Sequence, residues 1–208
     1  MTKPLFIAFE GIDGCGKTTQ LERLAMRLAA DKVDYVTCRA IGGSKLGDEV
    51  RKIFLHGPDM TALSELLLMS ACVAQMIAEV VRPALAEGKW VLCDRWYLSS
   101  IAYQGYGKGL DIKTIDRIRK EVCQVFNPDL IVYIQAPIEV CKDRSFIRNK
   151  GKIDRFESMG LDFFQRVEKG FEVTASFFSP NIKRIDGTAP ASIVARDIWN
   201  AISETPRV

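Results

Sequence analysis

The sequence predicts an α/β fold with three layers, in which a parallel sheet of about five strands lies between helices on both faces. Two observations lead to this prediction. Short apolar runs rich in β-branched residues alternate along the chain with longer segments of helical periodicity. Strands that alternate with helices form right-handed crossovers, and such crossovers place the strands parallel in one sheet.

The individual elements follow from these patterns. The expected strands are residues 5–9, 34–38, 90–94, 128–135 and 182–186. The expected helices are residues 16–31, 44–55, 61–87, 111–125, 137–149, 157–178 and 190–203. Thr61 and Asp111 have side chains that can cap the helices they precede. Ligands of such sheets bind beyond the carboxyl ends of the strands, so functional residues are expected there.

Bulk composition favours one soluble domain over residues 1–208, because a chain of this length can form its own core. The net charge of +3 is too small to indicate nucleic-acid or membrane binding by itself. The six cysteines form no C-x-x-C pair and there is one histidine, so we expect no zinc site and a cytoplasmic location. The least polar stretch, residues 66–78, is shorter than the ~20 residues that span a bilayer.

Residues 11–18 fit the phosphate-loop pattern G-x-x-x-x-G-K-[ST], between an expected strand and an expected helix. Glycines let backbone N–H groups turn toward phosphate oxygens, and the helix N-terminus adds partial positive charge. Lys17 is then expected to reach the β- and γ-phosphates of ATP, and Thr18 to hold Mg²⁺. The alternative is a glycine-rich turn that binds nothing. The loop residues expected at ATP are Gly11, Ile12, Asp13, Gly14, Cys15, Gly16, Lys17, Thr18 and Thr19.

Asp13 is an unusual residue inside this loop, because a carboxylate that faces polyphosphate is repelled. Either it is a solvated loop acid, or it accepts a hydrogen bond from a hydroxyl of a second substrate. Asp94 and Arg95 end the strand 90–94. Asp94 stands where a partner of Mg²⁺ is expected, and Arg95 can clamp phosphate with two hydrogen bonds. The alternative is a salt bridge at the strand end.

Two further regions have features that suit phosphoryl transfer. Segment 142–156 is basic and contains a glycine between two expected helices. It is either a solvated face or a small lid that brings cations to the transferring group. Residues 38–47 carry Arg39 and a glycine pair. Residues 99–109 form an expected irregular stretch whose aromatic side chains either stack on a sugar or base or lie at the rim.

Together these motifs resemble the thymidylate kinase family, whose members have the P-loop NTPase fold. The resemblance covers the chain in order: "FEGIDGCGKTTQ", "RAIGGSKLGDEVRKIFL", "DRWYLSSIAYQGYGKGL", "NPDLIVYIQAPIEVCKDR", "KGKIDRFE" and "RIDGTAP". The stretch from Asp94 to Gly105 is the most specific. The resemblance implies Mg²⁺-dependent transfer of the γ-phosphoryl group of ATP to dTMP, which gives dTDP and ADP for dTTP synthesis.

The resemblance also implies roles for individual residues. Lys17, Arg95, Arg148 and Asp13 form the catalytic group, and Thr18 and Asp94 hold the metal. Arg144 and Arg148 join the loop residues in binding ATP. The acceptor nucleotide is expected in regions 38–76 and 94–109, where Asp13 accepts from the 3′-hydroxyl and Arg39 and Arg95 hold the 5′-phosphate. The residues implied for dTMP are Asp13, Arg39, Met69, Val73, Gln75, Arg95, Ser99, Ser100, Tyr103 and Gln104.

The sequence departs from the family where the base is read. Family members carry F-x-A-D-R-A-Q on the third helix, but residues 69–75 are "MSACVAQ". Met69 replaces the Phe that stacks on thymine, and Val73 replaces the Arg that bonds its O4. Loss of a charged donor costs roughly 1.5–3 kcal/mol. Ala40 and Ile41 also replace Glu-Pro, which leaves the position of Arg39 open.

Three hypotheses therefore remain. The first is a thymidylate kinase that reads its base differently. The second is a deoxynucleoside monophosphate kinase with another preference, such as dUMP, a modified dUMP or another deoxypyrimidine nucleotide. The third is a nucleotide-binding module without turnover, which the retained Lys17, Asp94 and Arg95 disfavour. Nucleic acid and membranes are not expected partners, and the resemblance implies a homodimer packed through helices that include 61–87.

Overall fold

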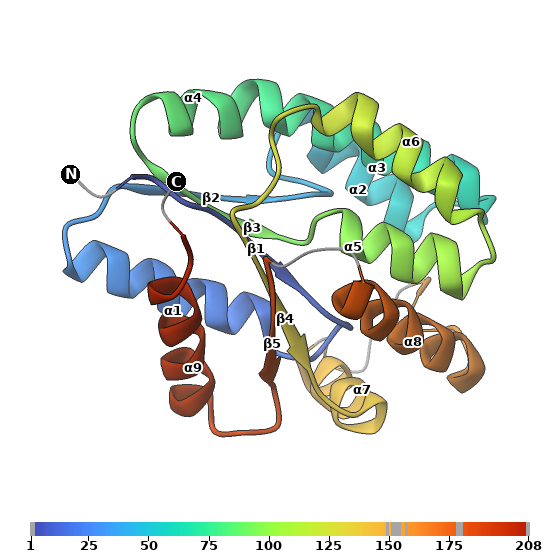
Figure 1. Ribbon diagram of the computed structural model, residues 1–208. Coiled ribbons are helices and arrows are strands. Elements are labelled where there is room, and N and C mark those ends of the chain that lie inside the picture. Colours follow the sequence, from blue (N-terminus) through green and yellow to red (C-terminus); the bar gives the residue numbers. More distant parts are fainter. Residues whose placement is uncertain (1–2, 149, 151–154, 157, 178–180, 207–208) are drawn as a thin grey trace.

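The computed structural model describes residues 3–148, 150, 155–156, 158–177 and 181–206 (Figure 1). Part of the expected lid, residues 149 and 151–154, therefore lies outside the described residues. The strands are β1 (Phe6–Glu10), β2 (Tyr35–Arg39), β3 (Trp90–Asp94), β4 (Leu130–Gln135) and β5 (Ile182–Asp186). They form a 5-stranded sheet of order β2-β3-β1-β4-β5, in which every neighbouring pair is parallel. The predicted fold class is confirmed.

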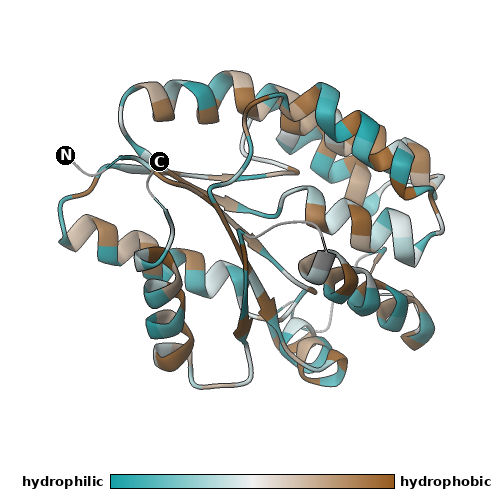
Figure 2. Cartoon of the chain, in the orientation of Figure 1, coloured by the Kyte–Doolittle hydropathy of each residue, from teal (hydrophilic) through white to brown (hydrophobic). Residues whose placement is uncertain are grey.

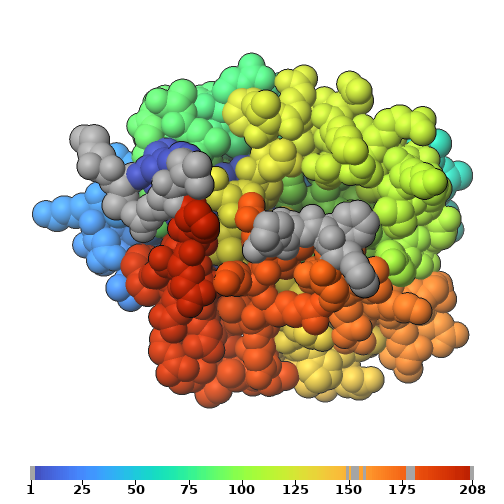
Figure 3. Space-filling model, in the orientation of Figure 1, coloured from blue at the N-terminus to red at the C-terminus, as the bar shows by residue number. Residues whose placement is uncertain are grey.

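Helices lie on both faces of this sheet. They are α1 (Lys17–Ala30), α2 (Lys45–His56), α3 (Ala62–Met76), η1 (Ile77–Val81), α4 (Arg82–Ala86), α5 (Tyr97–Ser100), η2 (Ile101–Gly107), α6 (Ile112–Cys123), α7 (Ile138–Arg148), α8 (Leu161–Phe177) and α9 (Ala191–Ser203). Helices α1 and α9 cover one face, and α3, α4 and α6 lie on the other (Figure 1). In Figure 3, α9 (red) lies at the surface beside residues of the N-terminal third (blue).

The core lies between the two helix layers. Strands β1 and β3 are buried along their whole length, because each has a neighbour on both sides and helices on both faces. Their hydrophobic residues belong to the core, and Figure 2 colours the strands at the centre of the sheet mostly as hydrophobic (brown). The ring of Phe6 meets the ring of Trp96 edge to face at 5.1 Å, which fixes the chain after β3 against the start of β1.

The cap predictions at Thr61 and Asp111 are confirmed. The Thr61 side chain accepts from the backbone N–H of Ser64, and the Asp111 side chain accepts from that of Thr114. The helix expected over 61–87 is also present, but its middle turns, Ile77–Val81, are π-helical. Pro83 follows within one turn and has no N–H to give to the regular pattern, which accounts for the change in this stretch.

One expectation about an element was wrong. Residues 97–107 form the helices α5 and η2 instead of an irregular stretch. The glycines at 105 and 107 suggested a loop, but side chains of neighbouring elements fill the space beside them. A Cβ at Gly107 would lie 2.6 Å from the Phe163 ring, so the glycine allows η2 to pack closely on α8.

The apolar helix Ala62–Ala86 is 25 residues long and has the length and composition to cross a membrane. This is longer than the stretch 66–78 that the sequence singled out. Half of its most apolar window is buried inside the protein. Core helices of soluble proteins satisfy the same test, and the inner face of this helix lies in the core described above.

Candidate active site

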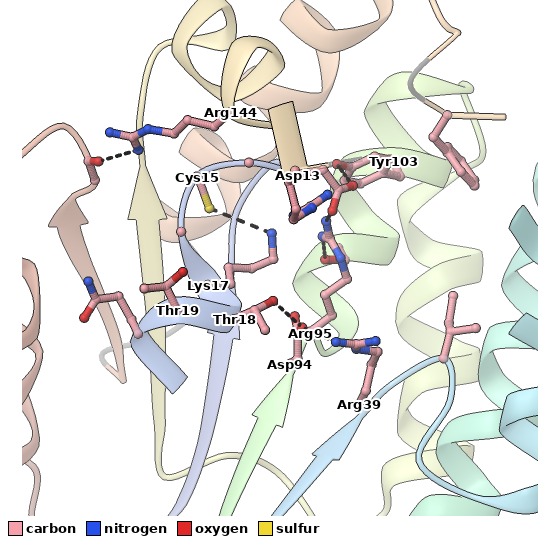
Figure 4. A pocket seen from close by; sticks show the side chains of 18 of the residues that line it. Asp13, Cys15, Lys17, Thr18, Thr19, Arg39, Asp94, Arg95, Tyr103 and Arg144 are labelled. Atoms are coloured by element: carbon pink, nitrogen blue, oxygen red, sulfur yellow. Dashed lines mark hydrogen bonds and ion pairs between the residues drawn. The ribbon is translucent and has the colours of Figure 1, made fainter. Parts of the chain in front are cut away.

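A cavity of about 940 Å³ opens at the carboxyl ends of β1, β2 and β3. The phosphate loop lies at its centre (Figure 4). One end is lined by Thr19, Gln20, Arg144, Gly187, Ala189, Ala191 and Val194, and the other by Arg39, Ile41, Arg51, Phe54, Leu55, Met69, Ser99, Tyr103, Gln104 and Phe156. We call these the donor end and the acceptor end.

The loop between β1 and α1 has a backbone that requires glycine. Gly14 has φ +87°, and a Cβ there would lie 1.9 Å from the Cys141 carbonyl oxygen. Gly16 has φ +109° and is the N-cap of α1 without a side-chain cap. The first N–H groups of α1 therefore have no side-chain acceptor at this cap. Such an uncapped helix N-terminus beside a cavity suits an anionic ligand.

Lys17 lies folded against the loop. Its ammonium group donates to the carbonyl oxygens of Gly11 and Ile12, both at 2.9 Å, and the residue is 5% exposed. Gly11 and Ile12 thus act through their backbone and do not line the cavity, whereas residues 13 to 19 do. The buried cation is held where phosphate would enter the loop, which agrees with the role expected for Lys17.

Asp94 ends β3 beside the loop and joins the two elements. Its Oδ2 accepts from Thr18 Oγ1 at 3.2 Å and from Arg39 Nη2 at 3.2 Å. Two oxygens at such a separation fit adjacent corners of an octahedron around Mg²⁺, whose ligands lie ~2.1 Å from the ion. The pair is therefore suited to hold Mg²⁺ together with phosphate oxygens. The contact also shows that Arg39 faces the cavity although Ala40 and Ile41 follow it.

Arg95 has an unusual backbone for a residue other than glycine, with φ +72°. Its Nη1 donates to Ser99 Oγ at 2.7 Å and to the Gly11 carbonyl at 3.1 Å, and its Nη2 lies 2.8 Å from Asp13 Oδ1. The Nη2 atom is buried but has no acceptor with hydrogen-bond geometry among the described residues. A strained backbone beside a buried guanidinium that is paired with Asp13 at the cavity wall is typical of a binding site.

Glu10 supports this arrangement, although no sequence motif indicated it. This carboxylate at the end of β1 is fully buried and accepts from the backbone N–H groups of Trp96 and Ser99, at 2.8 and 3.1 Å. Ser99 Oγ donates to it at 2.5 Å and in turn accepts from Arg95. Burial raises the pKa of Glu10, and the charge of Arg95 and the bonds from Ser99 and Trp96 oppose that shift.

Asp13 contacts Arg95 and Tyr103, and 37% of its side chain is exposed. The Tyr103 hydroxyl donates to its Oδ2 at 3.3 Å. Burial raises the pKa of Asp13, but the charges of Arg95 and Lys17 outweigh burial and hold that pKa well below its usual range. Burial and the Asp13 charge together raise the pKa of Tyr103 far above its usual range, so the phenol stays neutral. Asp13 is thus held by specific contacts inside the cavity, and its hydrogen bond to a second substrate stays a prediction.

The acceptor end has an apolar wall. Met69 lies in this wall and accepts a hydrogen bond from Ser100 Oγ at 3.2 Å through its sulfur. Val73 and Ser100 are fully buried and do not line the cavity. Gln75 lies on the outer side of α3, where its amide donates to Glu79. Of the residues implied for dTMP, these last three are not brought to the cavity.

Several residues that the sequence did not single out do line the acceptor end. Arg51 donates to the Ile41 carbonyl at 3.0 Å, and burial together with the Arg39 charge lowers the pKa of Arg51. Phe156 stacks on Phe54 at 5.3 Å and meets Tyr103 edge to face at 5.8 Å. Arg51 lies in an amphipathic helix, where a basic side chain normally indicates only a solvated face. Its position after the glycine pair was the available signal.

At the donor end, Arg144 donates to the Gly187 carbonyl at 2.9 Å, which joins α7 to the loop after β5. Arg148 lines the cavity and donates to Ser145 Oγ at 2.9 Å. Its charge also contributes to lowering the pKa of Asp13. Among the described residues, no group of three or more His, Cys, Asp and Glu side chains could hold a metal ion.

Comparison with known proteins agrees with this geometry. The family model described as thymidylate kinase matches residues 9–198. A thymidylate kinase from Deinococcus radiodurans is 40% identical over 205 residues, 98% of each chain. One from Psychrobacter sp. is 37% identical over 205 residues, 96% of this chain and 97% of that relative. The crystal structure of thymidylate kinase from Ehrlichia chaffeensis superposes with a TM-score of 0.79 at 30% identity, over 96% of this chain and 98% of that one. The chain belongs to the thymidylate kinase family of nucleoside monophosphate kinases.

Proposed function

We propose that this protein transfers the γ-phosphoryl group of ATP to the 5′-phosphate of dTMP, giving ADP and dTDP. The observation that carries the proposal is the single cavity with the phosphate loop at its centre and an arginine-rich acceptor end beside it. ATP would enter from the donor end, with its base near Arg144 and Gly187. The acceptor would lie along Arg39, Arg95, Tyr103 and Met69.

The proposed mechanism needs no protein base, because the acceptor is already a phosphate oxyanion. Lys17 would neutralise the donor phosphates, and the guanidinium of Arg95 would hold the acceptor phosphate close to the γ-phosphate. Mg²⁺, when bound at Thr18 and Asp94, would neutralise charge on the phosphate oxygens. Arg148 would approach from the lid side. Catalysis is then positioning and charge stabilisation by preformed groups.

Asp13 has a second role in this proposal. Its contacts with Arg95 and Tyr103 place the carboxylate at the boundary between phosphate loop and acceptor end. There it would accept a hydrogen bond from the 3′-hydroxyl of the acceptor sugar. Tyr103 packs against the ring of Phe156 and would fill the space that a 2′-hydroxyl requires.

A second candidate is the same reaction with a different deoxypyrimidine acceptor. It is favoured by one observation: the position of the family's base-reading arginine holds Val73, which is fully buried behind the cavity wall. The base would then be read by Gln104 and by packing on Met69.

We also propose a cytoplasmic homodimer. All six cysteines are free and buried, which suits a reducing compartment. Leu63 and Leu67 on α3 are 43% and 51% exposed, and Ala71, Ala74 and Ala78 continue their line along the outer face. Their spacing of three and four residues forms one apolar stripe on a long helix, as a helix–helix interface requires.

The test is ADP release from ATP and Mg²⁺ with dTMP, dUMP, 5-hydroxymethyl-dUMP, dCMP, dGMP, dAMP and UMP as acceptors. The highest kcat/KM with dTMP supports the first proposal. A clear preference for another deoxypyrimidine nucleotide supports the second. No turnover with any acceptor, from folded protein that binds ATP, contradicts both and favours a binding module.

A further inference from the structure

Glu65 is a buried carboxylate that the proposed mechanism does not use. It lies on the inner face of α3 and is 0% exposed. Lys108 Nζ lies 2.6 Å and Arg155 Nη2 2.7 Å from its Oε1, while Gln104 Nε2 donates to its Oε2 at 3.0 Å. A buried carboxylate is costly unless it is paired, and this one is paired with two cations and an amide.

The contact with Gln104 fixes the direction of that side chain's amide. A carboxylate between two cations is an acceptor only, so the amide group can face it with its nitrogen but not with its oxygen. The carbonyl oxygen Oε1 lies on the other branch of the planar amide, away from Glu65. Gln104 itself is 2% exposed and lines the acceptor end of the cavity with Met69 and Tyr103.

We propose that Glu65 is a positioning residue for specificity, which turns Gln104 so that a carbonyl acceptor faces the base of the acceptor nucleotide. This inference rests on the proposed function and names the class of base that the site selects. Thymine and uracil carry an N3–H donor, whereas N3 of cytosine is an acceptor. A fixed carbonyl oxygen therefore accepts a hydrogen bond from N3–H of thymine or uracil. With cytosine, the same oxygen faces the lone pair of N3 and is repelled.

The surroundings of Glu65 keep this orientation from reversing. Arg155 also donates to the Phe54 carbonyl at 3.0 Å, and its guanidinium lies 4.9 Å from the centre of the Phe156 ring. Lys108 lies 5.5 Å from the same ring. The cations that hold Glu65 are thus themselves fixed against the apolar wall of the acceptor end. The loss of an arginine donor at Val73 makes the orientation of Gln104 more important for discrimination.

The experiment compares kcat/KM for dTMP and dCMP in the wild type, Glu65→Gln, Gln104→Met and the control Lys120→Met. A glutamine at 65 can present either its amide oxygen or its amide nitrogen to Gln104. The side-chain amide of Gln104 can then adopt either of its two orientations. We expect the ratio of dTMP to dCMP efficiency to fall roughly 10- to 100-fold in Glu65→Gln and in Gln104→Met. Lys120→Met is the control: it removes an exposed lysine that pairs with Asp116 on α6, so its ratio should stay within about twofold of wild type.

An unchanged ratio of dTMP to dCMP efficiency in Glu65→Gln would overturn the proposal. This includes an equal loss of kcat/KM for both nucleotides, because such a loss indicates only a structural role for Glu65. A ratio that falls as far in Lys120→Met contradicts it too. If Glu65→Gln does not fold, Gln104→Met decides alone, since a retained ratio shows that no carbonyl there selects the base. Failure of the proposed function is distinguishable, because wild type would then phosphorylate neither nucleotide.

Discussion

Arg95 is the residue on which the acceptor end depends most. It combines a left-handed backbone, an ion pair with Asp13 and bonds to Ser99 and Gly11. Backbone strain of this kind costs about 1–3 kcal/mol and persists only where surrounding contacts fix it. Here they fix a guanidinium at the boundary between the two proposed phosphates, so small changes around it should alter turnover more than folding.

Lys17 gives the most direct test of the phosphate loop. Lys17→Met keeps the buried aliphatic stem but removes the charge that faces the donor phosphates. We expect kcat to fall roughly 10²- to 10³-fold, as loss of a preorganised donor does elsewhere. The measurement is ADP release with saturating ATP and dTMP, with a circular dichroism melt to confirm folding.

The matched control is Lys52→Met, which removes an exposed lysine paired only with Glu49 on α2. It should retain wild-type turnover. Near-normal kcat in Lys17→Met would show that the loop does not act on the transferring phosphate.

Asp13→Asn tests whether Asp13 binds the acceptor nucleotide and whether its charge is needed beside Arg95. Asparagine can still meet a sugar hydroxyl but no longer pairs with Arg95, so we expect KM for dTMP to rise roughly tenfold and KM for ATP to change little. Steady-state kinetics with each substrate varied in turn measure this. Equal increases in both KM values would remove Asp13 from the acceptor site.

The pH dependence of stability follows from the lowered pKa of Asp13. In the unfolded chain the group titrates near its ordinary value of 3.8, and in the folded protein well below it. The ion pair therefore stabilises the fold fully above about pH 5, and this contribution is lost as pH falls below the unfolded value. The difference in urea midpoint between wild type and Asp13→Asn should be constant from about pH 7 to pH 5 and shrink toward pH 3.

Local motifs account for the site residues that the sequence predicted. Lys17, Thr18, Asp94 and Arg95 lie within a few residues of a strand end or glycine pattern, so their proximity follows from the parallel sheet alone. Glu10 and Arg51 could not be found in this way. Glu10 acts on residues 86 and 89 positions later in the chain, and no sequence pattern connects them.

At the scale of elements, α5 and η2 show why one helix was missed. The segment has glycines at 105 and 107, and its N-cap is Trp96, which makes no side-chain cap bond. The cap comes from Glu10 of β1, whose carboxylate takes the N–H groups of Trp96 and Ser99. Helix signals in a sequence are local, whereas this helix begins where a distant strand end provides its acceptor.

Glu10→Gln therefore tests whether this cap also orients Arg95. Glutamine has one acceptor oxygen in place of two, so some of the contacts with Trp96 and Ser99 must be lost. We expect a loss of roughly 1–3 kcal/mol in unfolding free energy and a tenfold or larger rise in KM for dTMP. Asp111→Ala removes the cap of α6 and provides the control, with a loss of about 1 kcal/mol and no change in KM. An unchanged KM in Glu10→Gln would limit Glu10 to a structural role.

At the scale of the whole molecule, the fold was predictable because each of its layers has a simple cause. Alternating strands and helices give the parallel sheet, and the phosphate loop after the central strand β1 marks the edge where ligands bind. The layer arrangement does not depend on the exact residues at 69 and 73. The wall of the acceptor end does depend on them, because Met69 lines it and Val73 lies buried behind it, so the sequence pattern left the base preference open.

The outer face of α3 provides the prediction at this scale. Leu63 and Leu67 lie on the side opposite to Glu65 and Met69, which face the acceptor end. If the stripe is the interface of a homodimer, Leu67→Glu places a charge in an apolar contact, which costs several kcal/mol and should give a monomer. Met26→Glu, at a 64% exposed position on α1, should leave the dimer intact. Sedimentation velocity at micromolar concentration measures both.

The Leu67→Glu variant also tests whether dimer formation supports the acceptor end of the cavity. Because the inner face of α3 carries Glu65 and Met69, loss of the partner should loosen the acceptor wall, while the phosphate loop at the carboxyl end of β1 should stay in place. The Leu67→Glu monomer should therefore show a raised KM for dTMP and an unchanged KM for ATP. A wild-type protein that sediments as a monomer would contradict the interface, and a monomeric variant with normal KM for dTMP would contradict the link between the two faces of α3.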